Sequence, residues 1–88
     1  MIFVSMGKFR RKPTKEAVAQ FDKIWKEIEK DGVKRLALYW TLGRYDTIGI
    51  IEAPNERTAM KASLRFSEAV ALETLTAVTR DEAIKLLD

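Results

Sequence analysis

The chain has 88 residues, 47% of them hydrophobic and 33% charged, with a formal net charge of +3; this is the composition of a globular domain and not of a disordered chain. It contains neither Cys nor His, which excludes disulfides, thiol nucleophiles, Ser-His-Asp catalysis and ordinary zinc sites. No apolar run reaches the roughly 18 residues of a membrane span, and the start lacks the basic region of a signal peptide, so we expect one cytoplasmic domain over residues 1–88 with no membrane partner.

The first expected element is a strand over residues 2–7, which is short, apolar and followed by a basic segment. A helix begins after Thr14, whose side chain suits an N-cap, and it ends at Gly32, which can adopt the left-handed backbone conformation. The hydrophobic face of this helix is predicted from apolar residues at helical spacing, namely Ala17, Val18, Phe21, Ile24, Trp25 and Ile28.

A hairpin is expected next, with strands over residues 33–40 and 46–52. The connection between them is short and contains Gly43, which can adopt positive φ, so the two strands are predicted to pair antiparallel. Strict alternation along the first of these strands predicts two faces. One face would hold Leu36, Leu38 and Trp40, and the other Val33, Arg35, Ala37 and Tyr39.

The second half of the chain repeats the pattern of a helix followed by a strand. A helix runs from an N-cap at Asn55 to about residue 68, and a strand covers residues 71–78. A capping box over residues 79–82 precedes a short helix over residues 83–87. The order β-α-β-β-α-β-α predicts an α+β fold, the ferredoxin-like βαββαβ arrangement with a short C-terminal helix. Its four-stranded antiparallel sheet would have the order fourth, first, third, second, and both main helices would cover one face.

Both faces of the predicted sheet carry apolar residues, although helices can cover only one of them. In the third strand, for example, Ile48 and Ile50 point to one side and Ile51 to the other. The uncovered face needs a partner, and a second copy related by a two-fold axis is the simplest one. We therefore expect a homodimer through the sheet face. The alternative is a monomer that tolerates a few exposed Ile and Tyr side chains.

Three segments carry a family resemblance: Tyr-Trp-Thr-Leu-Gly-Arg-Tyr-Asp at 39–46, Glu-Ala-Pro at 52–54 and Glu-Thr-Leu at 73–75. Through these segments the chain resembles the GYD domain family over nearly its whole length. The family is named after Gly, Tyr and Asp, which are here Gly43, Tyr45 and Asp46, with Arg44 inserted after the glycine. The resemblance implies a dimeric α/β barrel, in which two ferredoxin-like sheets close against each other. The family is found in bacteria and archaea, its chemistry is largely uncharacterised, and it implies no catalytic residue here.

The segment with this resemblance also contains the candidate ligand site, at the mouth of the barrel interior. An alternative interpretation is purely structural, with Asp46 accepting hydrogen bonds from nearby backbone N–H groups. A carboxylate pair for acid–base chemistry has little support, because Asp46 and Glu52 would lie about 20 Å apart and Glu73 belongs to a strand beyond the first one. The predicted ligand-binding residues are Tyr39, Trp40, Arg44, Tyr45 and Asp46.

Positive charge is concentrated between the first strand and the first helix, where residues 8–15 hold five of the 16 basic residues. Arg10, Arg11 and Lys12 are the candidate anion-binding residues, and a solvated loop is the alternative. We expect no nucleic-acid partner, because the third strand lacks the aromatic residues on which bases stack. Asn and Gln occur once each in this highly charged chain, a depletion typical of thermophilic proteins.

The sequence leaves the biochemical function open between three classes. The first is a homodimeric α/β-barrel protein that binds a small molecule in the barrel interior. The second is a cofactor-independent oxygenase or isomerase of the dimeric barrel type, an analogy of fold alone. The third is a regulatory module that senses a metabolite. We expect no cofactor and no metal, since oxygen ligands are scattered and haem would lack its usual axial ligand.

Overall fold

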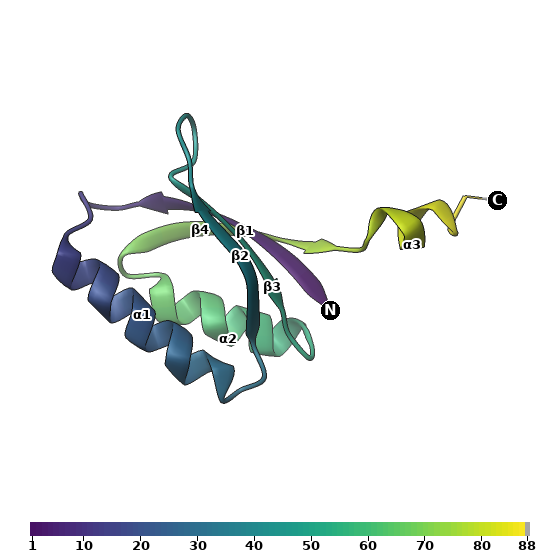
Figure 1. Ribbon diagram of the computed structural model, residues 1–88, viewed down its shortest axis with the longest axis horizontal. Helices are drawn as coiled ribbons and strands as arrows, with labels where there is room; N and C mark the ends of the chain where they lie inside the picture. The colour runs from purple at the N-terminus through teal and green to yellow at the C-terminus, as the bar shows by residue number, and fades with distance from the viewer. Residues whose placement is uncertain (88) are drawn as a thin grey trace.

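A computed structural model describes residues 1–87 of the chain, which form a four-stranded antiparallel sheet and two longer helices that cover one of its faces (Figure 1). The strands lie in the order β2-β3-β1-β4. The fold is therefore the predicted α+β, ferredoxin-like arrangement, with the predicted strand order. The elements are β1 (Ile2–Phe9), α1 (Lys15–Glu29), β2 (Lys34–Trp40), β3 (Thr47–Glu52), α2 (Glu56–Phe66), β4 (Val70–Ala77) and α3 (Arg80–Ile84).

All three helices begin at side chains that accept a hydrogen bond from the backbone of the first turn. Thr14 Oγ1 accepts from Ala17 N at 3.1 Å, and Asn55 Oδ1 accepts from Thr58 N at 2.8 Å. Thr79 caps α3 in the same way by accepting from the backbone N–H of Glu82. The three predicted caps are confirmed, but the predicted bounds of the last helix are wrong. The helix begins at Arg80, directly after its cap, because residues 80–82 form the first turn, whose N–H of Glu82 bonds to Thr79.

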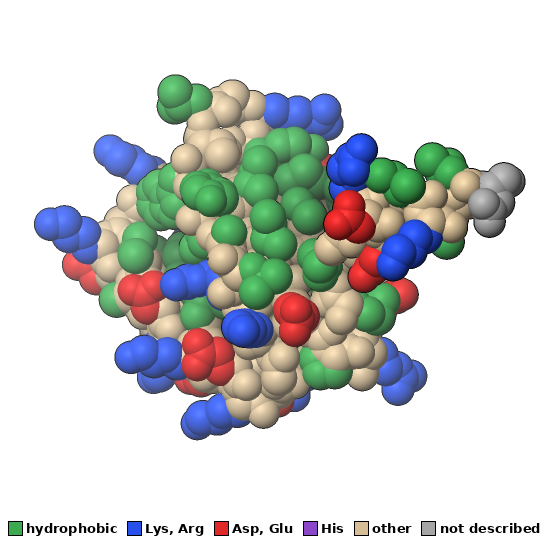
Figure 2. All heavy atoms as spheres, turned by 45° about the vertical axis from the view of Figure 1, so that its right-hand side comes forward, with side chains coloured by type: hydrophobic (Ala, Val, Ile, Leu, Met, Phe, Trp, Pro, Cys, Tyr) green, Lys and Arg blue, Asp and Glu red, His purple; other side chains and the backbone are tan. Residues whose placement is uncertain are grey.

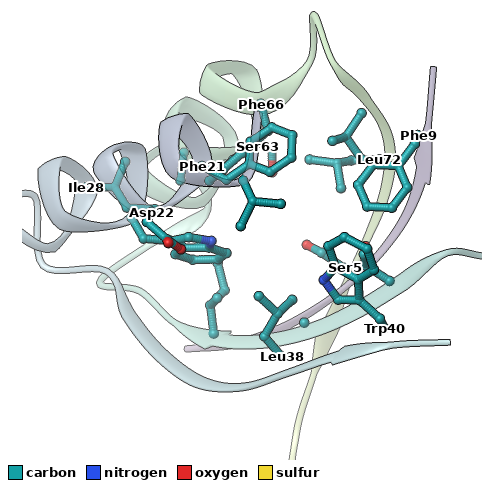
Figure 3. A pocket seen from close by; sticks show the side chains of 17 residues that line it. Ser5, Phe9, Phe21, Asp22, Ile28, Leu38, Trp40, Ser63, Phe66 and Leu72 are labelled. Atoms are coloured by element: carbon teal, nitrogen blue, oxygen red, sulfur yellow. The ribbon is translucent and has the colours of Figure 1, made fainter. Parts of the chain in front are cut away.

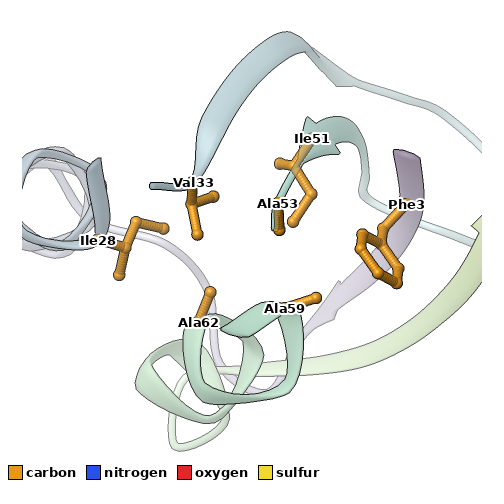
Figure 4. Close-up of a cluster of buried hydrophobic side chains, with 7 residues drawn as sticks. All are labelled: Phe3, Ile28, Val33, Ile51, Ala53, Ala59 and Ala62. Carbon is orange, nitrogen blue, oxygen red and sulfur yellow. The ribbon is translucent and has the colours of Figure 1, made fainter. Parts of the chain in front are cut away.

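The buried core lies between the helices and the middle of the sheet (Figure 4). Phe3 of β1 and Ile51 of β3 are register partners, and both point toward the helices. From α2 only small side chains, Ala59 and Ala62, are buried, so this helix can approach the sheet closely. The core cluster is Phe3, Ile28, Val33, Ile51, Ala53, Ala59 and Ala62.

An irregularity at Leu36 changes which face each residue of β2 occupies. Arg35 pairs with Ile51, and Ala37 pairs with Ile50, so one residue of β2 has no counterpart in β3. Arg35 therefore lies on the helix side, where its guanidinium is 5.2 Å from the ring centre of Trp25. Strict alternation had placed Val33 and Arg35 with Ala37 and Tyr39, and that prediction is wrong because a bulge shifts the phase of the strand; Val33 instead belongs to the buried core on the helix side.

The face of the sheet that points away from the helices is predominantly apolar, and Figure 2 shows hydrophobic side chains gathered in one area bordered by charged ones. Within it, Tyr39 is 62% exposed and Leu75 is 48% exposed. The second apolar face predicted from the sequence is thus present. We call it the outer sheet surface, and the strand registers assign to it Ile2, Val4, Met6, Ala37, Tyr39, Ile48, Ile50, Leu75 and Ala77.

The end of the chain leaves the body of the fold. After β4, residues 78–87 continue past the edge of the sheet, and α3 stands clear of the two longer helices (Figure 1). The structure accordingly extends 49 Å along its longest axis and only 17 Å along its shortest. Among residues 1–87 no helix combines the length and hydropathy needed to cross a membrane.

Candidate functional site

Asp46 connects the β2–β3 hairpin to β1 through two hydrogen bonds and closes the hairpin through a third. Its Oδ2 accepts from the backbone N–H of Phe9 at 2.8 Å, and its own N–H donates to the carbonyl of Gly7 at 2.8 Å. Its carbonyl accepts from the N–H of Thr41, also at 2.8 Å. These contacts match the structural interpretation of this residue, while ligand binding by Asp46 remains a prediction.

Tyr45 reaches across β1 to a carboxylate on β4. Its hydroxyl donates a hydrogen bond to Glu73 Oε2 at 2.6 Å. This bond, together with desolvation, raises the pKa of Tyr45 above its ordinary value, because the neutral phenol is the donor. The guanidinium of Arg44 lies 5.5 Å from the ring centre of Tyr45. Glu73 was not among the predicted site residues, because the sequence does not show that a tyrosine side chain can reach across one intervening strand.

Tyr39 and Trp40 are neighbours in the sequence but lie on opposite faces of β2. Tyr39 is part of the outer sheet surface, whereas Trp40 pairs with Thr47 on the helix side and packs 5.1 Å from Phe9, measured between ring centres. Of the five predicted ligand-binding residues, the structure thus brings together Arg44, Tyr45 and Asp46 at the hairpin. Trp40 points to the helix side of the sheet, whereas Tyr39 lies on the outer sheet surface.

The basic segment after β1 is partly engaged in contacts within the chain. Arg10 Nε donates to the carbonyl of Ser67 at 2.9 Å, which attaches the segment to the connection before β4. Arg11 and Lys12 line a shallow depression that also includes the carboxylates of Glu27 and Glu68. The candidate anion-binding residues therefore have mixed charge around them, and anion binding remains a prediction.

A cavity of ≈ 150 Å³ lies between the sheet and the two longer helices (Figure 3). Its walls are mainly aromatic and aliphatic side chains. Phe21 of α1 is 6.4 Å from Phe9 and 5.9 Å from Phe66, measured between ring centres, and Trp25 is 5.1 Å from Phe66. Sequence reasoning assigned Phe21 and Trp25 to the hydrophobic face of a helix, and nothing in their spacing separates a packed face from a cavity wall. The remaining walls include Val18, Leu38, Trp40, Val70 and Leu72.

A small group of hydroxyls borders one part of this cavity. Ser5 Oγ lies 2.9 Å from Thr74 Oγ1, and Ser63 Oγ lies 3.4 Å from the same atom. Ser5 and Ser63 both line the cavity, as does the carboxylate of Asp22 (Figure 3). The site can therefore offer a bound molecule an apolar wall and a hydroxyl that donates or accepts one hydrogen bond.

The groups with displaced pKa values lie elsewhere. A hydrogen bond from Arg65 lowers the pKa of Glu27, which faces α2 across the helix pair, and Tyr45 belongs to the hairpin. Neither of them lines the cavity. Within residues 1–87 no group of three carboxylate, His or Cys side chains is arranged to hold a metal ion.

Comparison with known proteins places the chain in a family. No functionally curated protein matches it. Among solved structures, it is similar to CutA1 from Pyrococcus horikoshii at 21% identity over 99% of this chain and 95% of that one, with a TM-score of 0.42. A mutant of CutA1 from Pyrococcus horikoshii OT3 has 20% identity, the same coverage and a TM-score of 0.34. The sequence model of the GYD domain matches residues 4–87, and the chain accordingly belongs to the GYD domain family.

Proposed function

We propose that this protein is a homodimer in which each chain binds a small, uncharged aromatic molecule in the cavity between its sheet and helices. The observation that carries the proposal is a pocket of ≈ 150 Å³ between the sheet and the helices, with aromatic walls and a partial opening to solvent beside the exposed Trp40. Protein interiors are normally close-packed, with few voids larger than a water molecule. Aromatic side chains that line an open pocket leave room for a guest molecule, and the pocket therefore favours ligand binding.

The size of the cavity limits the class of ligand. An apolar cavity of about 150 Å³ in another protein holds a benzene-sized molecule and otherwise stays dry. A single aromatic ring would restore the dispersion contacts that the cavity walls lack. Rings such as Phe21 and Phe66 also favour an aromatic guest through edge-to-face packing.

The polar groups in the walls refine this class. Hydroxyls of Ser5 and Ser63 can form a hydrogen bond with one O–H or N–H of the ligand. The carboxylate of Asp22 disfavours an anionic ligand by charge repulsion. We therefore expect phenol and indole to bind more tightly than toluene, and benzoate to bind weakest. This site lies on the helix side of the sheet, away from Tyr39 and Tyr45.

Binding is tested by titrating indole, phenol, toluene and benzoate into the protein and recording amide chemical shifts and the melting temperature. Val18→Phe extends a ring toward the cavity from α1 and is expected to abolish indole binding. Ala19→Phe adds the same ring at an exposed neighbouring position, so it is the matched control and should bind indole as the parent does. Equal indole affinity in both variants, or no binding of any of the four probes, would contradict the proposal.

The homodimer is supported by the outer sheet surface. Its middle is apolar, with Val4 and Ile50 as register partners on the two central strands. At one end Lys34 pairs with Glu52. A surface with both charge signs at its edge and an apolar centre can pack against its own copy about a two-fold axis without net repulsion. A second copy is therefore the occupant that we propose for this face.

Sedimentation measures the oligomeric state directly. We expect the parent protein at micromolar concentration to have twice the mass of the 10.1 kDa chain. Ile50→Lys places a charge in the middle of the outer sheet surface and should give a folded 10.1 kDa particle. Leu64→Lys, at an exposed position of α2, is the control that should remain dimeric. A parent protein that sediments as 10.1 kDa would remove the dimer.

Binding is proposed here in preference to catalysis. An oxygenase or isomerase would be supported by a carboxylate or tyrosine of displaced pKa inside the cavity, and Glu27 and Tyr45 both lie outside it. The sensor alternative makes a separate prediction, since a sensor changes its oligomeric state when it binds its metabolite. Sedimentation with and without indole therefore distinguishes a simple binding protein from a sensor.

A further inference from the structure

The segment formed by residues 78–87, which we call the C-terminal arm, makes its hydrogen bonds only within itself among the residues that the structure describes. Backbone bonds join Ala83 N to Thr79 O and Leu87 N to Ile84 O, both inside the arm. Its ion pair, between Arg80 and Asp81, is internal as well. The arm is thus a separate element that projects from the end of β4 (Figure 1).

Four of the ten residues of the arm are large hydrophobic residues that lie open to solvent. Leu86 and Leu87 are 78% and 76% exposed, and Val78 and Ile84 are 55% and 44% exposed. Isolated helices shorter than about 12–15 residues are marginal in water, and most helices in proteins are held by packing of an apolar face. The five residues of α3 therefore need a surface to pack on.

We propose that the arm of each chain packs against the second copy of the chain, so that the two copies exchange arms at the border of the outer sheet surface. The proposal rests on the homodimer proposed above. Ala77, the last residue of β4, pairs with Ile2 and already belongs to that surface. The arm continues the same surface outward, beyond the reach of its own sheet (Figure 1).

Packing back on its own sheet is disfavoured by the local sequence. Residues 78–87 contain no Gly and no Pro, the residues that most readily form a tight reversal. Thr79, where the chain would have to turn, is extended, with φ −65° and ψ 157°, and its side chain is engaged as the cap of α3. The direction set at the end of β4 is therefore maintained into the helix.

The area of the outer sheet surface also supports packing of the arm against the second copy of the chain. Four strands about 4.8 Å apart and six to eight residues long, at about 3.3 Å per residue, project an area of roughly 450 Å². A stable interface of standard size buries about 800 Å² per partner. The outer sheet surface alone is small by this measure, and an exchanged arm with four large hydrophobic residues would add to it on both copies.

The contact is tested in mixed dimers of the full chain. Because the sequence has no Cys, Lys85→Cys gives one attachment point in the arm for a spin label. The spin-labelled chain is mixed with an isotope-labelled parent chain, so that any amide signal broadened by the label reports a contact between copies. We expect broadening in β1 and β4 of the isotope-labelled chain. The control label at Met60→Cys, on the exposed side of α2, should leave those signals sharp.

The contribution of the arm to association is measured with Leu86→Asp/Leu87→Asp in a sedimentation dilution series. We expect the dissociation constant of the dimer to rise about tenfold or more, with circular dichroism unchanged. Leu64→Asp, at an exposed leucine outside the arm, should leave the dissociation constant unchanged. A dimer without broadening from the Lys85→Cys label, or with an unchanged dissociation constant, would overturn the exchange while the dimer stands. A monomeric parent protein would overturn both.

Discussion

The hydroxyl of Tyr45 donates a hydrogen bond to Glu73 Oε2 at 2.6 Å, although β1 lies between the strands nearest to them. Glu73 is the register partner of Met6, so the tyrosine side chain crosses the central strand on the outer face of the sheet. This contact joins the hairpin of the GYD segment to the edge strand β4. Tyr45 and Glu73 belong to two of the segments that carry the family resemblance, and this hydrogen bond brings those segments together.

We predict that the phenol of Tyr45 titrates above its ordinary pKa of about 10, because the hydrogen bond to Glu73 favours the protonated form. In a Tyr39→Phe background, Tyr45 is the remaining tyrosine, and the ultraviolet absorbance of its phenolate follows the titration. Glu73→Gln should bring the midpoint back toward the ordinary value. An unchanged midpoint in Glu73→Gln would show that the bond does not form in solution.

The same shift has a consequence for stability. The pKa of Tyr45 is higher in the folded chain than in the unfolded one. The stabilising effect of its hydrogen bond on the folded state is therefore fully present below about pH 10, and it is lost as the pH rises through the folded pKa. Unfolding by urea should therefore show a loss of stability in the parent at alkaline pH. The loss should be smaller in Tyr45→Phe, which carries no titrating hydroxyl.

For Asp46, we predict that replacement by Ala destabilises the fold by about 1–3 kcal/mol, because the backbone N–H of Phe9 loses its acceptor. Asp46→Asn keeps one side-chain oxygen at this position and should lose less. Urea denaturation measures both variants. If they lost equal stability, the acceptor would not be the important feature, and if neither did, the structural role of Asp46 would be refuted.

Two glycines of the central strands make a matched pair. A Cβ at Gly7 would come within 2.9 Å of Val70 Cγ1, so Gly7→Ala should cost about 1–3 kcal/mol through overpacking. A Cβ at Gly49 would meet Leu38 Cδ1 at 3.5 Å, an ordinary contact, so Gly49→Ala should change stability little. Chemical denaturation of both variants checks the order, and a reversed order would contradict the packing described here.

The last mutational prediction concerns the ion pair between the two longer helices. The pKa of Glu27 is lowered by its hydrogen bond with Arg65, so its stabilising effect is present above about pH 4.3 and is lost as the pH falls through the folded pKa. Glu27→Gln should be less stable than the parent at neutral pH, and the difference should vanish in acid. Melting curves of both proteins at the two pH values give the comparison, and a constant difference would exclude the pair as its source.

The fold could be predicted from the sequence because its signals are local. Thr14, Asn55 and Thr79 are the N-caps at which the three helices begin. Gly32 and Gly43 occupy turn positions with φ of +90° and +102°. Helix and strand periodicity then leaves few ways to connect the elements. The bulge at Leu36 has no such local signal, which is why the face of Arg35 was assigned wrongly.

The candidate site was less predictable because it depends on distances between elements. Phe21 and Trp25 have the spacing of an ordinary helix face, and only the separation of α1 from the sheet decides whether they fill the interior or line a cavity. The hydrogen bond of Tyr45 likewise depends on how far a side chain reaches across a neighbouring strand. Neither quantity is encoded in a short stretch of sequence.

The unfilled space between helices and sheet also makes the molecule soft in one direction. Hydrostatic pressure favours the state with the smaller volume, and loosening the helices lets water hydrate the apolar walls of this partly open pocket more completely. Compression should therefore loosen α1 and α2 from the sheet at lower pressure than it separates the strands, whose hydrogen-bonded ladders leave no such space. A molecule that fills the space would stiffen this layer and make the protein more resistant to compression.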